Sequence, residues 1–306
     1  MDTRSRTAAM TALIFGAVAI GFAPILMRLT ETGPAAAAFW RLTLALPLLT
    51  VFAFRGAGGA AALRPNRAVI LAGVFFACDL GFWHYSVALT SVANSTVLAN
   101  LTPIVVTIAG WWLFRERPAR AFLIGLALGI AGAATMALAH HEGAPIGRDP
   151  HTGDIFALIT TLFYAGYFLS IRAARGRYGT GAVMFWSSLI GAVLIAGLML
   201  ALGEQVIPSS AAGWAACAGL AAVHVFGQGA IALALGRLPA ATASVVVLIQ
   251  PAIAALLGWL LFAEAIVPMQ GLGAIVALTG VAIAQWASAR NENGRRSRQE
   301  PAPAVS

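Results

Sequence analysis

The sequence predicts an all-α integral membrane protein with ten transmembrane helices, arranged as two inverted five-helix repeats. Three observations carry this prediction. First, 60% of the 306 residues are hydrophobic, 10% are charged and the mean hydropathy is +0.85, and a soluble chain cannot hide so much apolar surface because its exterior must be hydrated. Second, the chain divides into ten long apolar runs. Third, its two halves share one sequence pattern.

Each apolar run has about 20 residues, the length that an α-helix needs to cross the hydrocarbon core. Continuous runs favour helices over barrel strands, in which apolar and polar residues would alternate. The predicted spans are 8–27, 35–54, 68–89, 94–114, 121–139, 153–171, 180–202, 213–235, 242–262 and 269–288. We expect a first repeat over 8–139, a periplasmic linker over 140–152, a second repeat over 153–288 and a disordered cytoplasmic tail over 289–306.

The internal repeat is clearest in the fourth and ninth spans. NSTVLANLTPIVVTIAGWWLFRE, beginning at residue 94, returns 148 positions later as TASVVVLIQPAIAALLGWLLFAE. Pro103 aligns with Pro251, and each has a carboxamide nearby, Asn100 and Gln250 respectively. Proline removes one backbone donor and kinks a helix. We therefore expect both helices to bend at equivalent places, where they line a polar pathway.

Arginine predicts the orientation, since all 19 basic residues are arginine. Sixteen of them lie on the side of the N-terminus, Arg28 and Arg148 lie on the other side, and Arg41 lies inside the second span. By the positive-inside rule both termini are cytoplasmic, and we expect a bacterial inner-membrane protein. Because five spans per repeat is an odd number, the halves cross the membrane in opposite directions. Inverted repeats are typical of secondary transporters, which bind substrate near the midplane at the repeat interface.

Polar side chains inside the spans are the candidate site residues, because they are costly in lipid. His224 and Gln228 lie one turn apart on one helix face. A structural hydrogen bond inside the bundle explains each intramembrane histidine equally well. The predicted substrate-binding residues are Trp83, His84, Tyr85, Asn100, Tyr164, His224, Gln228 and Gln250.

Four charged residues are candidates for coupling or gating. Asp79 falls close to the midplane. Arg41 has two competing interpretations, in which its head group snorkels to the outer interface or forms a salt bridge with Asp79. Glu116 and Glu264 are predicted at opposite membrane faces, where each is suited to latch an arginine in a closed state. Ordinary solvated helix ends explain these glutamates as well.

Several function classes are excluded or disfavoured. No phosphate-binding loop is present, which argues against direct ATP coupling. The linker residues His140, His141, Glu142, Asp149 and His151 match no closed zinc site, and two isolated cysteines form no disulfide framework. Basic residues lie between the spans rather than on one face, so nucleic acid is not an expected partner. We expect no enzyme activity, no cofactor and no metal.

The segments PIVVTIAGWWLFRE and PAIAALLGWLLFAE, each followed by a glycine-rich helix, resemble the drug/metabolite transporter superfamily, in particular its ten-helix EamA-type exporters. The resemblance covers roughly residues 8–288. Trp83, His84 and Tyr85 are similar to the cluster that aromatic amino-acid exporters place at their cavity. The resemblance implies export of small metabolites, often amino acids, by alternating access, and leaves proton coupling open. We expect a monomer or weak dimer.

Two other functions stay open at this point. One is a drug or organic-cation/proton antiporter of the same fold, and the other is a membrane enzyme or scaffold that acts on lipid. Sugar-phosphate exchangers of the superfamily use intramembrane lysine and arginine. The chain has no lysine and only Arg41 in such a position, which argues against that branch.

Overall fold

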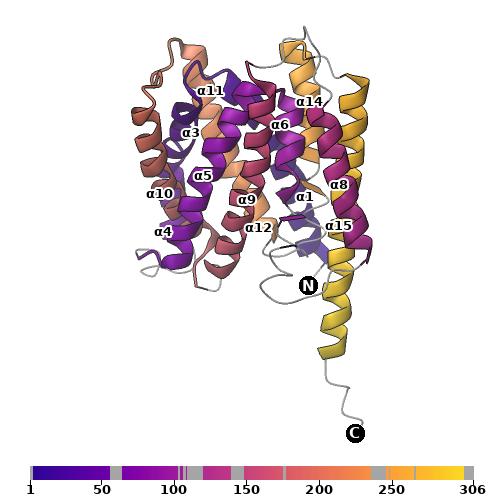
Figure 1. Ribbon diagram of the computed structural model, residues 1–306. Helices are drawn as coiled ribbons and strands as arrows, with labels where there is room; N and C mark the ends of the chain where they lie inside the picture. Colours follow the sequence, from indigo (N-terminus) through magenta and orange to yellow (C-terminus); the bar gives the residue numbers. More distant parts are fainter. Residues whose placement is uncertain are drawn as a thin grey trace.

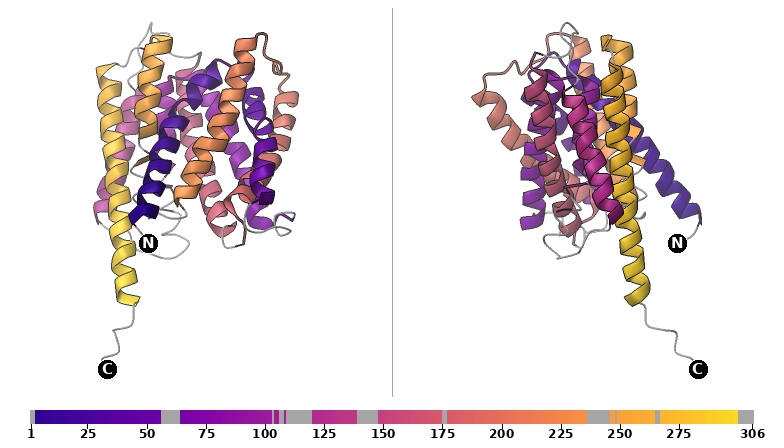
Figure 2. Two further views of the ribbon diagram at one scale, coloured as in Figure 1. Left: turned by 180° about the vertical axis from the view of Figure 1, so that it is seen from behind. Right: turned by 45° about the vertical axis from the view of Figure 1, so that its right-hand side comes forward.

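The computed structural model describes residues 3–55, 64–102, 104–105, 108, 120–138, 148–174, 177–235, 246–247, 249–264 and 267–299. All regular elements within these ranges are helices, which pack side by side in one bundle with both chain termini at the same end (Figures 1 and 2). We call the opposite end the distal end. Six helical segments among the described residues are long and apolar enough to cross a membrane. The all-helical class is confirmed, and the count of ten spans stays a prediction.

The described helices overlap the predicted spans. The first half contains α1 (Thr3–Gly21), α2 (Ala23–Arg28), α3 (Pro34–Thr43), α4 (Leu46–Arg55), α5 (Arg67–Leu89), α6 (Val92–Ala99) and α8 (Arg120–Leu138). The second half contains α9 (Pro150–Ala174), α10 (Thr180–Ala201), α11 (Ala211–Ala222), the π-helix η2 (Val223–Gln228), α12 (Gly229–Leu235), α14 (Ile249–Phe262) and α15 (Pro268–Gln299).

The first two predicted spans are each divided into two helices. Pro24 stands in the first turn of α2, and Pro47 is the second residue of α4. Proline fits a first helical turn because its missing N–H would have no partner there. Each divided segment, Thr7–Arg28 and Pro34–Arg55, is still long and apolar enough to cross a membrane.

The fourth predicted helix is interrupted early, because α6 ends at Ala99. A proline at position 103 cannot donate to the carbonyl four residues before it, which is that of Ala99. The Thr102 hydroxyl donates to this carbonyl instead, at 2.7 Å. The interruption thus comes just before the predicted kink, although Pro103 itself lies outside the described residues.

The C-terminal helix is longer than predicted. We expected a disordered tail from residue 289, but α15 continues to Gln299, so this prediction is wrong for the first part of the tail. Arginine, glutamate and glutamine are good helix formers, and the segment has no proline before Pro301. Figures 1 and 2 show the end of α15 projecting beyond the rest of the bundle.

Glycines line the most extensive contact between described helices, that of α8 with α15 (Figure 1). A Cβ added at Gly125 would lie 2.5 Å from the Ala284 nitrogen and 2.6 Å from the Gly280 carbonyl oxygen. Only glycine therefore allows these two backbones to approach so closely, as in other membrane helix pairs.

The remaining contacts relate equivalent parts of the two halves. α3 and α4 pack on α10, and α6 packs on α14. α5 packs on α9, and in the same way α1 packs on η2 and α12. Apolar side chains such as Val193 and Leu200, 65% and 70% exposed, cover the outside of the bundle. Lipid is the environment in which such a surface is stable.

Candidate functional site

A buried cluster of polar side chains lies halfway along the bundle. It contains Arg41 from α3, Asp79 from α5, Tyr164 from α9, and His224 and Gln228 from η2. Arg41 and Asp79 are 4% and 5% exposed, and both η2 residues are buried as well. Asp79, Tyr164 and His224 each stand near the middle of their apolar segment. The cluster therefore joins both halves of the chain at mid-depth.

Arg41 carries the positive charge of this cluster and lies within electrostatic range of Asp79, Tyr164, Tyr167 and both intramembrane histidines. Its side chain is buried, so it does not snorkel to an interface, and among the described residues it forms no ion pair with Asp79. Its Nε atom has no hydrogen-bond partner. The guanidinium lies over the ring of Trp83, 5.7 Å from the ring centroid.

The two buried histidines each keep one ring nitrogen that has no hydrogen-bond partner among the described residues. His84 Nδ1 lies 3.1 Å from the Pro34 carbonyl oxygen, and because a carbonyl only accepts, this nitrogen donates. Neutral His84 therefore presents an acceptor at Nε2, which has no partner. His224 Nε2 lies 2.9 Å from Ser188 Oγ, and its Nδ1 has no partner. Buried unpartnered polar atoms are unusual and call for a functional explanation.

Aromatic rings form the apolar side of the cluster. Phe76 stacks between Tyr167 and His224, with ring centroids 4.5 Å and 5.4 Å away. Tyr164 stands next in line, 6.0 Å from Tyr167, and accepts a hydrogen bond from Gln228 Nε2 at 3.4 Å. Polar groups are thus presented beside a column of rings, an arrangement suited to a ligand with both apolar and polar parts.

The π-helix places His224 and Gln228 in the cluster. η2 spans Val223–Gln228 and interrupts the α-helical segment 211–235. π-helical turns are rare and often occur at functional sites. The sequence placed these two residues on one face, and both are directed inward as expected, but the π-turn itself has no signal that we recognised in the sequence.

Three predicted site residues make their polar contacts outside the cluster. The Tyr85 hydroxyl donates to the Glu204 carboxylate, which also accepts from the α3 amides of Ala35 and Ala36 at 3.2 Å and 2.8 Å. Asn100 caps α6 and donates to the Thr96 carbonyl at 2.9 Å. Gln250 lies in α14 beside α1. No hydrogen bond within the described part of the chain links any of the three to the cluster.

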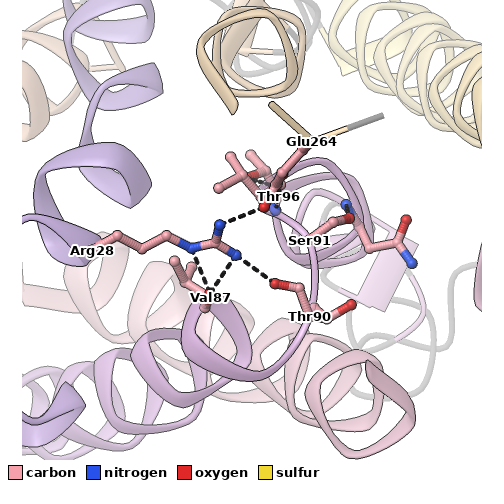
Figure 3. A network of polar contacts seen from close by, with 8 residues as sticks. Arg28, Val87, Thr90, Ser91, Thr96 and Glu264 are labelled. Carbon is pink, nitrogen blue, oxygen red and sulfur yellow. Dashed lines mark hydrogen bonds and ion pairs between the residues drawn. The ribbon is translucent and has the colours of Figure 1, made fainter. Parts of the chain in front are cut away.

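A second network of polar contacts lies at the distal end of the bundle (Figure 3). Glu264 forms an ion pair with Arg28, the last residue of α2, and accepts from the Val92 amide of α6 at 2.9 Å. Arg28 also donates to the carbonyls of Val87 and Thr90, with distances between 2.6 Å and 3.0 Å. This network connects the ends of α2, α5 and α6 to the segment after α14.

Asp154 of α9 supports the same end. Its carboxylate accepts from Thr90 Oγ1 at 2.8 Å and from Asn94 Nδ2 at 3.1–3.2 Å, and it is 3% exposed. Sequence reasoning missed Asp154, Arg28 and Phe76. A carboxylate inside an apolar run was a usable signal for Asp154. Arg28 and Phe76 contact residues that are distant in the sequence, so their partners become known only from the fold.

Some predictions fall on residues that the structure does not describe. They concern Pro103, Glu116 and most of the linker 140–152. The helix kink expected at Pro251 also stays a prediction, because the residues before α14 are only partly described.

These observations define a multi-pass helical membrane protein with a polar site buried at mid-depth. The EamA-like transporter family matches residues 7–138 and 151–285, one match in each half. The chain belongs to this family, whose members are membrane solute transporters rather than enzymes. The chain is similar in structure to one solved protein, described as "Crystal structure of protein", with a TM-score of 0.65 and 19% sequence identity. The match covers 92% of this chain and 98% of that one, and at this identity it supports the fold alone. A search of curated proteins found no significant match.

Proposed function

We propose that the chain is a secondary transporter that exports amino acids, chiefly aromatic and other hydrophobic ones, across a bacterial inner membrane. The carrying observation is the buried cluster around Arg41, in which polar groups of both halves meet at mid-depth beside aromatic rings. A site at this depth is where alternating access places a substrate. In this proposal the chain has two inverted repeats of five helices and both termini are cytoplasmic. The proposal is supported by Figure 1, in which the N and C marks lie at the same end of the bundle.

Alternating access requires a closed barrier on one side of the site at a time. The Arg28–Glu264 network supports such a role for the distal end, which is periplasmic in the proposed orientation. It joins both halves through side chains that are 19% and 6% exposed. In this proposal the network closes the periplasmic side, and its separation opens that side for release.

The test is uptake into proteoliposomes that contain the purified protein, with a panel of labelled amino acids, with and without a pH gradient. Protein-dependent flux without a gradient indicates a facilitative carrier, and flux that requires the gradient indicates proton coupling. If His84→Ala and Gln250→Ala both fold and transport at the wild-type rate, these two residues do not bind substrate.

A drug or organic-cation/proton antiporter is the competing function. Asp79 favours it, because a buried carboxylate in a membrane helix suits either a cation or a proton. No amino-acid flux under either condition, together with pH-dependent flux of an organic cation, would select this alternative. The oligomeric state has no bearing on either proposal, and we expect a monomer or weak dimer.

A further inference from the structure

We propose that Arg41 and Asp79 together form a two-point site for zwitterionic α-amino acids, in which Arg41 binds the carboxylate and Asp79 binds the ammonium group. This inference rests on the proposed function and specifies its substrate class. It gives both residues a binding role rather than the gating or coupling role that the sequence suggested.

Arg41 has the properties of an anion-binding residue. Its side chain is 4% exposed, its Nε atom has no partner, and it makes no hydrogen bond or ion pair within the described part of the chain. A guanidinium presents five donors in a planar fork that matches a carboxylate. A buried charge without a partner is strongly unfavourable, so a carboxylate is the natural ligand for this group.

Asp79 supplies the opposite charge close by. Its carboxylate is 5% exposed and accepts no hydrogen bond from the described residues. The Arg41 guanidinium lies 5.7 Å from the ring centroid of Trp83, which stands one helical turn after Asp79 in α5, so the two groups are near, although they form no ion pair. A ligand that carries both charges on neighbouring atoms satisfies both groups. A simple cation would leave Arg41 without a partner, and a simple anion would leave Asp79 without one.

Aromatic rings nearby suit the side chain of such a ligand. The ring centroid of Trp83 lies 5.7 Å from the Arg41 guanidinium, and the stacked rings of Tyr164 and Tyr167 belong to the same cluster. Aromatic rings beside a charged pair favour an apolar side chain on the bound amino acid. The class is therefore an α-amino acid with a free carboxylate, a free ammonium group and an apolar side chain.

The first part of the test varies the ligand. Calorimetric binding to the purified full chain in detergent would compare L-phenylalanine with L-phenylalaninamide and 3-phenylpropanoate, which lack the carboxylate charge and the ammonium group respectively. L-leucine would be compared with its own amide and des-amino acid in the same way. We expect each zwitterion to bind about tenfold to a hundredfold more tightly than either analogue, the range for losing one charge-assisted hydrogen bond.

The second part varies the chain. Arg41→Gln should weaken L-phenylalanine about tenfold or more and remove the preference over the amide, and Arg41→Lys should keep part of that preference. Asp79→Asn should remove the preference over 3-phenylpropanoate instead. Arg148→Gln, which changes an exposed arginine near the distal end, is the matched control and should leave all affinities unchanged.

Two results would overturn the inference. One is equal affinity of the wild-type chain for the zwitterion and its amide, a comparison that needs no variant to fold. The other is no binding of any zwitterion in the panel. If amino acids are transported but the amide binds equally well, only this inference fails. If zwitterions bind with the expected preference but are not transported, the inference stands and the proposed function fails.

Discussion

Neutralising Glu264 should open the distal end of the bundle. In Glu264→Gln the ion pair with Arg28 loses its charge, but the amide still accepts from Val92 N, and Arg28 keeps its bonds to the Val87 and Thr90 carbonyls. The loss is therefore part of one charge-assisted hydrogen bond, about 1–2 kcal/mol. Such a loss shifts the ratio of closed to open molecules by about 5- to 30-fold.

A cysteine at position 92 would report this shift. Val92 is 0% exposed in the closed arrangement, so Val92→Cys, with Cys78 and Cys217 replaced by alanine, should react with a membrane-impermeant maleimide only in open molecules. The labelling rate should rise about tenfold in Glu264→Gln. Asp149→Asn is the control, because this distal carboxylate bonds to Thr152 in its own segment. A Glu264→Gln rate within twofold of the parent would refute the idea that the pair is a gate.

Three further predictions concern stability, each measured as the melting temperature of the purified protein. Gly125→Ala should destabilise the α8–α15 contact by about 1–3 kcal/mol, whereas Gly197→Ala, with nothing within 4 Å of its added Cβ, should not lower the melting temperature; equal effects would contradict the close-contact explanation. Tyr85→Phe should lower the free energy of unfolding by about 1–2 kcal/mol through the lost hydrogen bond to Glu204. A large loss of substrate affinity without destabilisation would instead indicate that Tyr85 binds substrate. Hydrogen bonds from the Ser209 and Ser210 side chains lower the pKa of Glu31, so its contribution is present above the unfolded pKa of 4.5 and is lost as the pH falls through the folded value. The melting temperatures of wild type and Glu31→Gln should therefore converge as the pH drops below 4.5, and a constant difference would refute this.

Much of the fold was predictable because lipid imposes simple rules on sequence. Apolar runs located the helices, and Pro103 pointed to a bend close to the place where α6 ends. The breaks before α2 and before α4 were not predicted, although Pro24 and Pro47 stand beside them. The continuation of α15 to Gln299 was missed, because a polar, arginine-rich composition is typical of both exposed helices and disordered tails.

The site was predictable only in part. The cost of burying polar groups singled out Arg41, Asp79, His224 and Gln228, and all four are buried in the structure, while their role in binding stays a prediction. Sequence could not show that the Tyr85 hydroxyl binds Glu204, 119 positions away, or that Arg28 meets Glu264, 236 positions away. Such partners are set by how distant helices pack, and no local pattern encodes that.

The central claim is that one buried site binds substrate and faces each side of the membrane in turn. Its most direct test is exchange from proteoliposomes loaded with labelled L-phenylalanine. Unlabelled L-phenylalanine outside should accelerate the efflux of the labelled pool. A carrier that binds external substrate can return to the inside loaded, and it therefore avoids the slower reorientation of the empty site. The acceleration should be lost in a folded His224→Ala, Gln228→Ala double variant. The account would be contradicted by an efflux rate that does not depend on external substrate. It would also be contradicted if the double variant kept the full acceleration.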